Sequence, residues 1–367
     1  MKKYVTIALL SSLILAGCNT AVAKQKKEAK TNDSNKEVKP VQVVLPQGLV
    51  TWDPITNQSN STVLYTKDLR DSFTEVQYHI WRTADGQGSK KVFSSKDAAN
   101  NFALPFQLQA FNSKRGEYQI ETYGIKADGQ QVDLVKSSIT FQQYVPILMY
   151  HYVDEYKGEG IKSLFVHPTN FEAQMKYLKD NGYTLLTFER WTDVNKVNKP
   201  IFVTFDDGAK NNVNALAIFQ KLKDEHFQPA ATEYLVTDSL DLPGKLTKDD
   251  VKQMSDSGIF SIQSHTLTHA NLPFVPTELA ETELKQSKEK IEALTGKPVI
   301  SLAYPVGYYS NEIVEMTKKY YQYAVTTDKG QFVEKGKPNE LYLMERIIVM
   351  YDTSLQSFAA SIKEKLY

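Results

Sequence analysis

The chain has 367 residues, of which 41% are hydrophobic and 23% are charged, and these values suit a globular protein of about two domains. Lysine and arginine (43) balance aspartate and glutamate (43), so the formal net charge is zero. A neutral chain argues against a nucleic-acid-binding protein, which would usually be basic.

The first 18 residues have the pattern of an export signal. Lys2 and Lys3 precede an apolar run over residues 4–16, which is too short to span a membrane comfortably. The run ends in Leu-Ala-Gly-Cys and resembles a bacterial lipoprotein signal, in which cleavage precedes the cysteine and a lipid is attached to it. This resemblance implies a signal peptide over residues 1–18 and a lipid on Cys18, which would anchor the protein at the extracellular face of the cell membrane. A plain secretory signal with a chance cysteine is the alternative.

Residues 19–40 are predicted to form a disordered tether. The segment is rich in lysine, glutamate, asparagine and threonine and has almost no large apolar side chain. Such a segment cannot bury enough surface to offset the entropy lost on ordering. The tether would hold the folded part away from the membrane, and it favours a monomer.

Residues 41–143 are predicted to form a small all-β, sandwich-like domain. Apolar and polar residues alternate in about seven short runs; Val76, Tyr78 and Ile80, for example, would share one face of a strand. Asp-Gly pairs mark turns between runs. The segment resembles the extracellular β-repeat modules of streptococcal surface proteins. A wall- or glycan-binding module and a simple spacer both remain open.

Residues 144–367 are predicted to form an α/β barrel, because apolar strand-like runs alternate with helical segments. The first helix is expected over residues 170–181, with Thr169 as its N-cap. The clearest strands are expected at residues 145–150, 201–205, 229–236, 258–262, 299–303, 323–326 and 346–350. In barrels of this kind the chemistry gathers at the C-terminal ends of the strands.

Two polar motifs directly follow predicted strands. Asp206 and Asp207 precede Gly208, and a nearby cation would offset the cost of burying two adjacent carboxylates. His265 and His269 have a spacing that lets both imidazoles face one point. Alone, Asp-Asp-Gly is usually a turn and His-x-x-x-His is often a surface coincidence. Together at strand ends, two histidines and one carboxylate predict a divalent metal site with open positions.

These motifs, with a third over residues 302–307, resemble the ordered motifs of the polysaccharide deacetylase family (NodB homology, carbohydrate esterase family 4). The resemblance covers about residues 146–349. It implies a distorted (β/α)7 barrel that removes N-acetyl groups from an N-acetylglucosamine-containing polysaccharide and releases acetate.

The resemblance also implies a role for each matching residue. Asp207, His265 and His269 match the metal ligands, and Asp206 matches the catalytic base. Tyr304 matches the residue whose backbone N–H helps to form the oxyanion hole. Zn²⁺ suits this ligand set best, and Co²⁺, Ni²⁺ or Fe²⁺ would also fit.

One further residue follows from a branch of the family that deacetylates poly-β-1,6-N-acetylglucosamine in biofilms. The segment ending in His151 resembles the start of that branch's domain, and His151 matches its general acid; a strand-end histidine that caps backbone is the alternative. The usual arginine of the third motif is absent here. We therefore expect Arg346 to pair with Asp206 and keep it ionised, although a surface arginine is an equal alternative.

The aromatic residues Tyr308 and Tyr309 follow the third motif and would either stack on sugar rings or pack in the core. Two other classes of protein remain open: a glycoside hydrolase that uses two carboxylates, and a glycan-binding lipoprotein without activity. The sequence does not distinguish among poly-β-1,6-N-acetylglucosamine, other exopolysaccharides, peptidoglycan and chitin oligomers as substrates.

Overall fold

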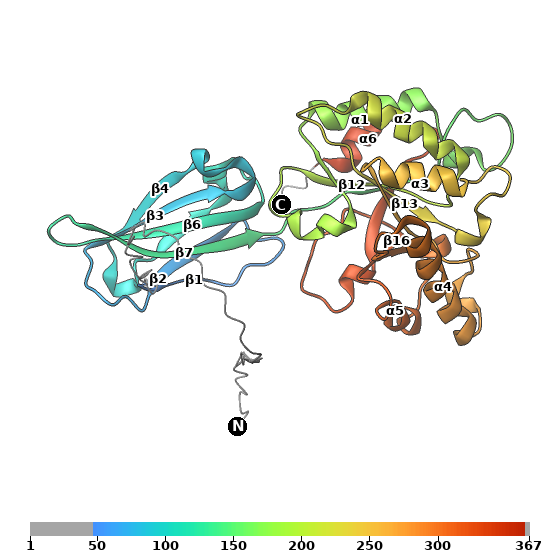
Figure 1. The fold of residues 1–367 in the computed structure, drawn as a ribbon. Helices are drawn as coiled ribbons and strands as arrows, with labels where there is room; N and C mark the ends of the chain where they lie inside the picture. The colour runs from blue at the N-terminus through green and yellow to red at the C-terminus, as the bar shows by residue number, and fades with distance from the viewer. Residues whose placement is uncertain (1–46, 364–367) are drawn as a thin grey trace, which may run out of the picture. The chain divides into compact units, whose positions relative to one another are not determined.

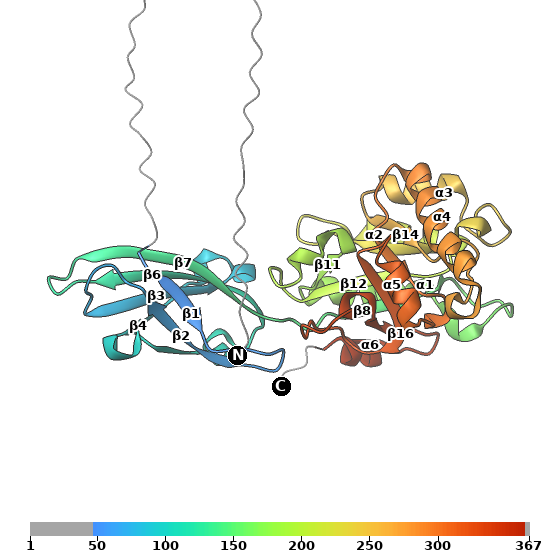
Figure 2. The same ribbon diagram turned by 90° about the horizontal axis from the view of Figure 1, so that it is seen from below.

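The computed structural model describes residues 47–363, so the predicted signal peptide, the tether and Cys18 lie outside the described residues. The described part consists of an antiparallel β-region followed by a barrel of parallel strands and helices (Figure 1 and Figure 2). Between residues 47 and 363, no helix has the length and apolar character that a membrane span requires.

The β-region has two antiparallel sheets, with strand orders β1-β2-β5 and β4-β3-β6-β7. Its strands are β1 (Leu49–Trp52), β2 (Ser61–Lys67), β3 (Glu75–Arg82), β4 (Lys91–Ser95), β5 (Leu104–Gln107), β6 (Gly116–Ile125) and β7 (Gln131–Phe141). As the alternation predicts, Val76, Tyr78 and Ile80 of β3 are buried together. They share one core with Leu64 of β2 and Phe106 of β5, which confirms the predicted sandwich-like fold.

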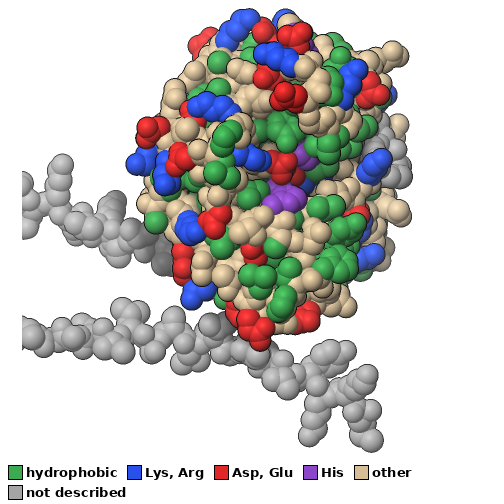
Figure 3. All heavy atoms as spheres, turned by 90° about the vertical axis from the view of Figure 1, so that its right-hand side faces the viewer, with side chains coloured by type: hydrophobic (Ala, Val, Ile, Leu, Met, Phe, Trp, Pro, Cys, Tyr) green, Lys and Arg blue, Asp and Glu red, His purple; other side chains and the backbone are tan. Residues whose placement is uncertain are grey.

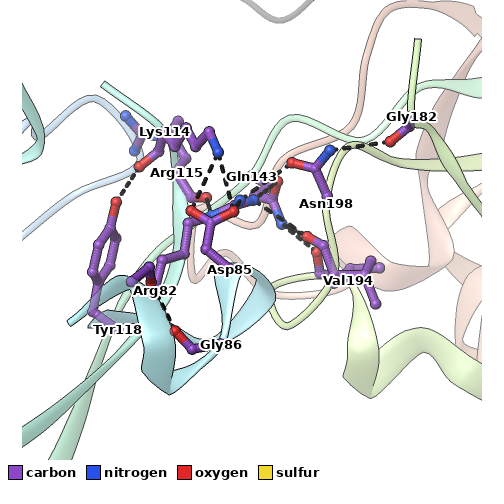
Figure 4. Close-up of polar contacts among 12 residues, drawn as sticks. Arg82, Asp85, Gly86, Lys114, Arg115, Tyr118, Gln143, Gly182, Val194 and Asn198 are labelled. Atoms are coloured by element: carbon purple, nitrogen blue, oxygen red, sulfur yellow. Dashed lines mark hydrogen bonds and ion pairs between the residues drawn. The ribbon is translucent and has the colours of Figure 1, made fainter. Parts of the chain in front are cut away.

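Two buried polar side chains connect the β-region to the segment that precedes the barrel strand β12 (Pro200–Phe205) (Figure 4). The Arg82 guanidinium donates to the Val197 carbonyl at 3.3 Å and to Asn198 Oδ1 at 3.2 Å. Gln143 Nε2 donates to the Val194 carbonyl at 2.6 Å. Buried side chains of this kind are costly unless they are hydrogen-bonded. These contacts therefore tie the two parts of the chain together locally.

The barrel sheet is parallel, with strand order β11-β12-β13-β14-β15-β16-β17-β8. Its strands are β8 (Ile147–Tyr150), β11 (Thr184–Leu186), β12 (Pro200–Phe205), β13 (Ala231–Leu235), β14 (Phe260–Ser264), β15 (Ser301–Ala303), β16 (Tyr323–Lys329) and β17 (Met344–Ile348). Because β8 pairs with both β17 and β12, seven strands close into a barrel, and β11 lies outside it against β12. The predicted (β/α)7 barrel is confirmed.

Helices flank the barrel strands and bury their apolar faces against them (Figure 1). They are α1 (Pro168–Asp180), α2 (Val213–Leu222), α3 (Lys248–Asp256), α4 (Thr277–Thr295), α5 (Asn311–Thr317) and α6 (Leu355–Ile362). The prediction of Thr169 as the first N-cap is wrong. The cap is His167, whose Nδ1 accepts from the Thr169 N–H at 3.3 Å, because Pro168 with its fixed φ is suited to the first helical position.

Candidate active site

The adjacent carboxylates Asp206 and Asp207 lie at the C-terminal end of β12, where the sequence predicts them. The Asp206 N–H continues the pairing of β12 with β8 by donating to the Tyr150 carbonyl at 3.0 Å. Asp207 then has a positive φ of 77°, which is uncommon for a residue other than glycine and turns the chain sharply. The turn lets both carboxylates lie at the same end of the barrel, although neighbouring side chains in a strand would point to opposite faces.

The two histidines come from the loop after β14 and approach the same carboxylate. His265 Nε2 and His269 Nε2 each lie 3.6 Å from Asp207 Oδ1. The Nδ1 of His265 is 2.8 Å from the Ala303 carbonyl on β15. Because a carbonyl can only accept, this contact assigns the ring proton to Nδ1 and leaves the Nε2 lone pair facing Asp207.

This group fits a divalent metal. One ligand atom from each of Asp207, His265 and His269 lies within 4.8 Å of the others. Burial lowers the pKa of His265 below its usual value, which favours the neutral imidazole that a metal requires. The bond from its other ring nitrogen to a backbone carbonyl is typical of metal-binding histidines. The donor set therefore matches the predicted site.

Arg346 of β17 forms a buried ion pair with Asp206. Its two terminal nitrogens lie 2.8 and 2.7 Å from the two carboxylate oxygens, and its Nε donates to the Thr326 carbonyl at 2.8 Å. Burial alone would raise the pKa of Asp206, but the guanidinium outweighs that effect and holds the pKa well below its usual range. The expected pairing is therefore present, and Arg346 is not a surface residue.

His151 follows β8 at the same rim of the barrel. Burial lowers the pKa of its imidazole, while the charges of Asp206 and Asp207 act in the opposite direction. Its Nδ1 is buried and has no hydrogen-bond partner among the described residues. At this nitrogen, therefore, His151 does not act as the alternative, a histidine that caps nearby backbone.

The prediction that the Tyr304 amide serves an oxyanion hole is wrong in this structure. That N–H donates to the Val325 carbonyl of β16 at 3.2 Å, so it belongs to the pairing of neighbouring strands. Two residues later, Val306 has a φ of 60° and is 51% exposed. A β-branched residue with positive φ is a genuine outlier, and such strain concentrates at functional sites. The sequence signal for Val306 is its place between Pro305 and Gly307.

Exposed aromatic side chains lie on loops that follow the barrel strands. Tyr308 is about half exposed, and Phe274, after the histidine loop, is 74% exposed; the centroids of their rings are 5.6 Å apart. Tyr309 is partly exposed and its hydroxyl donates to Asp328 at 3.3 Å. Figure 3 shows histidine and acidic side chains side by side on one face, with hydrophobic side chains around them. Sequence reasoning did not identify Phe274, because a single phenylalanine in a loop has no periodic signal.

Comparisons with known proteins agree with this geometry. The family model described as polysaccharide deacetylase matches residues 193–325. The solved structure of BC0361, a polysaccharide deacetylase from Bacillus cereus, is 58% identical, with 86% of this chain and 100% of that chain covered and a TM-score of 0.84. The Streptococcus pyogenes deacetylase PplD, solved in complex with acetate, is 26% identical, with 60% and 99% covered and a TM-score of 0.54.

A curated relative extends the match. YxkH of Bacillus subtilis, whose name assigns it to the polysaccharide deacetylases, is 31% identical over 226 residues, which are 60% of this chain and 76% of that one. The similarity therefore covers most of the relative, and the residues that the family model matches include Asp206, Asp207, His265 and His269. This chain belongs to the polysaccharide deacetylase family.

Proposed function

We propose that this protein hydrolyses N-acetyl groups of an extracellular polysaccharide containing N-acetylglucosamine and releases acetate in a metal-dependent reaction. The observation that carries the proposal is the cluster of Asp207, His265 and His269 at the rim that also bears the paired Asp206. It combines a metal-ligand set with a proton acceptor. The acetate named in the PplD structure is the product expected of such a reaction.

Asp207, His265 and His269 would hold the divalent cation. When bound, the cation would polarise the acetyl carbonyl and lower the pKa of a water from about 15.7 towards 7. Zn²⁺ suits two imidazoles and one carboxylate, and Co²⁺, Ni²⁺ and Fe²⁺ are the other candidates.

Asp206 is the proposed base. The pair with Arg346 keeps it ionised at neutral pH and fixes its orientation, so it can take the proton of the water that attacks the acetyl carbon. A C–O bond forms, the C–N bond then breaks, and acetate leaves. The glycoside hydrolase alternative loses support, because Arg346 balances the negative charge of Asp206 and Asp207 faces two imidazoles.

His151 is the proposed general acid for the leaving amine. As an imidazolium it would give the nitrogen the proton that lets the amine depart. Burial works against this charged form, so the nearby charges of Asp206 and Asp207 are needed to stabilise it.

The developing oxyanion needs a donor that is not already used. We assign this role to the Val306 N–H, because the second position of a one-turn 3₁₀ helix (Pro305–Gly307) offers its amide no acceptor within the helix. One such donor contributes about 3 kcal/mol to transition-state stabilisation. The positive φ at Val306 would turn the amide towards the site.

Substrate class and location complete the proposal. Tyr308 and the neighbouring Phe274 would stack on sugar rings of the polymer. The resemblance at His151 favours poly-β-1,6-N-acetylglucosamine. The signal at Cys18 favours a lipid anchor at the extracellular membrane face, and the predicted tether over residues 19–40 favours a monomer. Partition of full-length protein into detergent, lost on Cys18→Ala, is the expected test of the anchor.

The main experiment measures acetate released from N-acetylglucosamine oligomers and from a panel of acetylated polymers. We expect release that a chelator abolishes and Zn²⁺ or Co²⁺ restores, and none from the Asp207→Asn variant. Release that persists with chelator, or shortening of the oligomers, would contradict the proposal. No release under any metal would favour a binding protein instead.

A further inference from the structure

Glu283 of α4 is a charged residue within a buried helix face. It is 1% exposed, and Ala280, Leu284, Ser287 and Ile291 are buried on the same side of the helix. This spacing of three and four residues normally carries apolar side chains. A carboxylate at such a position is expensive unless strong hydrogen bonds compensate for the water that it loses.

The compensating bonds all come from the loop between the two histidines. Glu283 Oε2 accepts from the N–H groups of Leu267 at 2.9 Å and Thr268 at 2.8 Å, and Oε1 accepts from Thr268 Oγ1 at 2.5 Å. Among residues 47–363, no lysine or arginine forms an ion pair with Glu283. The two backbone N–H groups and the hydroxyl of this loop therefore supply its polar contacts.

The same loop is strained on both sides of these contacts. Thr266 has a φ of 68° and His269 a φ of 66°, and this left-handed conformation is unfavourable for residues other than glycine. The Thr266 hydroxyl accepts from the His269 N–H at 3.1 Å and so supports one of the two turns. Strained conformations persist only where the surroundings over-determine them. Glu283 binds the two residues that lie between the strained positions.

We propose that Glu283 is a positioning residue that holds the histidine loop in its metal-binding shape before the ion arrives. It does not reach the substrate, and it acts through Leu267 and Thr268. Without it, binding of the ion would have to order the loop as well, and affinity would fall by that cost. The inference rests on the metal site of the proposed function and adds the residue that preorganises it.

The test compares Glu283→Ala with Glu289→Ala, a glutamate of the same helix whose side chain is 59% exposed. Zn²⁺ affinity is measured by titration calorimetry, and the Co²⁺ absorption spectrum reports the ligand geometry. We expect Glu283→Ala to bind Zn²⁺ about 10–100-fold more weakly, with an altered Co²⁺ spectrum. The Glu289→Ala control should match the wild type.

Amide hydrogen exchange in metal-free protein gives a second readout that needs no ion. The Leu267 and Thr268 amides should exchange at least about tenfold faster in Glu283→Ala, while amides in β12 and β13 keep their protection. Unchanged Zn²⁺ affinity together with unchanged exchange at the two amides would overturn the proposal. Faster exchange throughout the barrel would also overturn it, since the role would then be general stability.

Two further outcomes are separable. If Glu283→Ala does not fold, Glu283→Gln takes its place, because the glutamine amide keeps the shape of the side chain but accepts hydrogen bonds only through its oxygen. We expect Glu283→Gln to bind Zn²⁺ about threefold more weakly than the wild type. Wild-type affinity in this variant would refute the proposal. If wild-type protein binds no metal, the proposed function fails. Exchange at Leu267 and Thr268 would then still show whether Glu283 holds the loop.

Discussion

Replacement of Arg346 by methionine should destabilise the barrel most at neutral pH and raise the pKa of Asp206. The Arg346 side chain is 0% and the Asp206 side chain 3% exposed, and their closest contact is 2.7 Å. Breaking such a pair from one side costs about 3–5 kcal/mol, a large share of a typical stability of about 5–15 kcal/mol. At about 1.4 kcal/mol per pKa unit, this corresponds to a pKa of Asp206 about 2–4 units above its depressed wild-type value.

The dependence on pH follows from the direction of each shift. In the wild type the folded pKa of Asp206 is depressed, so the pair contributes stability above the unfolded pKa of about 3.9 and loses it as pH falls through the folded pKa. In Arg346→Met, burial without a partner raises the folded pKa above the unfolded one. The variant therefore gains stability as pH falls through that raised value.

Urea unfolding of both proteins at about pH 7 and about pH 4 measures this difference. The deficit of Arg346→Met relative to wild type should shrink at the lower pH, and the acid side of its acetate-release profile should move upward. Arg190→Met is the matched control, since Arg190 is 52% exposed in its pair with Asp193 and exposed pairs contribute about 0–1 kcal/mol. An equal deficit at both pH values, with an unchanged activity profile, would refute the reasoning.

Other changes separate the remaining roles. His151→Ala should lower kcat by about 10²–10⁴-fold while Zn²⁺ affinity stays near wild type; a change confined to KM would contradict the general-acid role. Gly307→Ala should destabilise the protein far more than Gly296→Ala in thermal unfolding, because both have positive φ but only at Gly307 would the new Cβ lie 2.0 Å from a side-chain oxygen. Tyr308→Ala should raise KM for long oligomers more than for a disaccharide, and equal effects on both substrates would argue against sugar stacking.

The parts of the site that local patterns encode could be predicted from the sequence. Asp206 and Asp207 follow a strongly apolar strand, and His265 and His269 follow another, so the barrel rule brings them to one rim. The pairing of Arg346 with Asp206 was accessible only as a hypothesis, since it joins strands 140 residues apart in the sequence.

Features that depend on which strands pair in the folded barrel could not be predicted from local sequence patterns. The Tyr304 amide is used by Val325, a partner that becomes known only when β15 and β16 are aligned. The extra strand β11 and the cap at His167 were missed because short elements have weak periodicity. Glu283, in contrast, has a readable signal, since it interrupts an otherwise apolar helix face.

The contact between His265 and Ala303 would couple a bound metal ion to the integrity of the barrel. Strands β14 and β15 share a single register pair, Ser264 with Leu302. The barrel is therefore weakly paired at this position. The hydrogen bond from the His265 imidazole to the Ala303 carbonyl lies next to this register pair and adds a side-chain link between the two strands. An ion held by His265 would thus stabilise the pairing of β14 with β15. Loss of the ion would weaken this pairing before the other strand pairs of the barrel. The melting temperature measured with and without chelator would then report on the pairing of β14 with β15 as well as on metal binding.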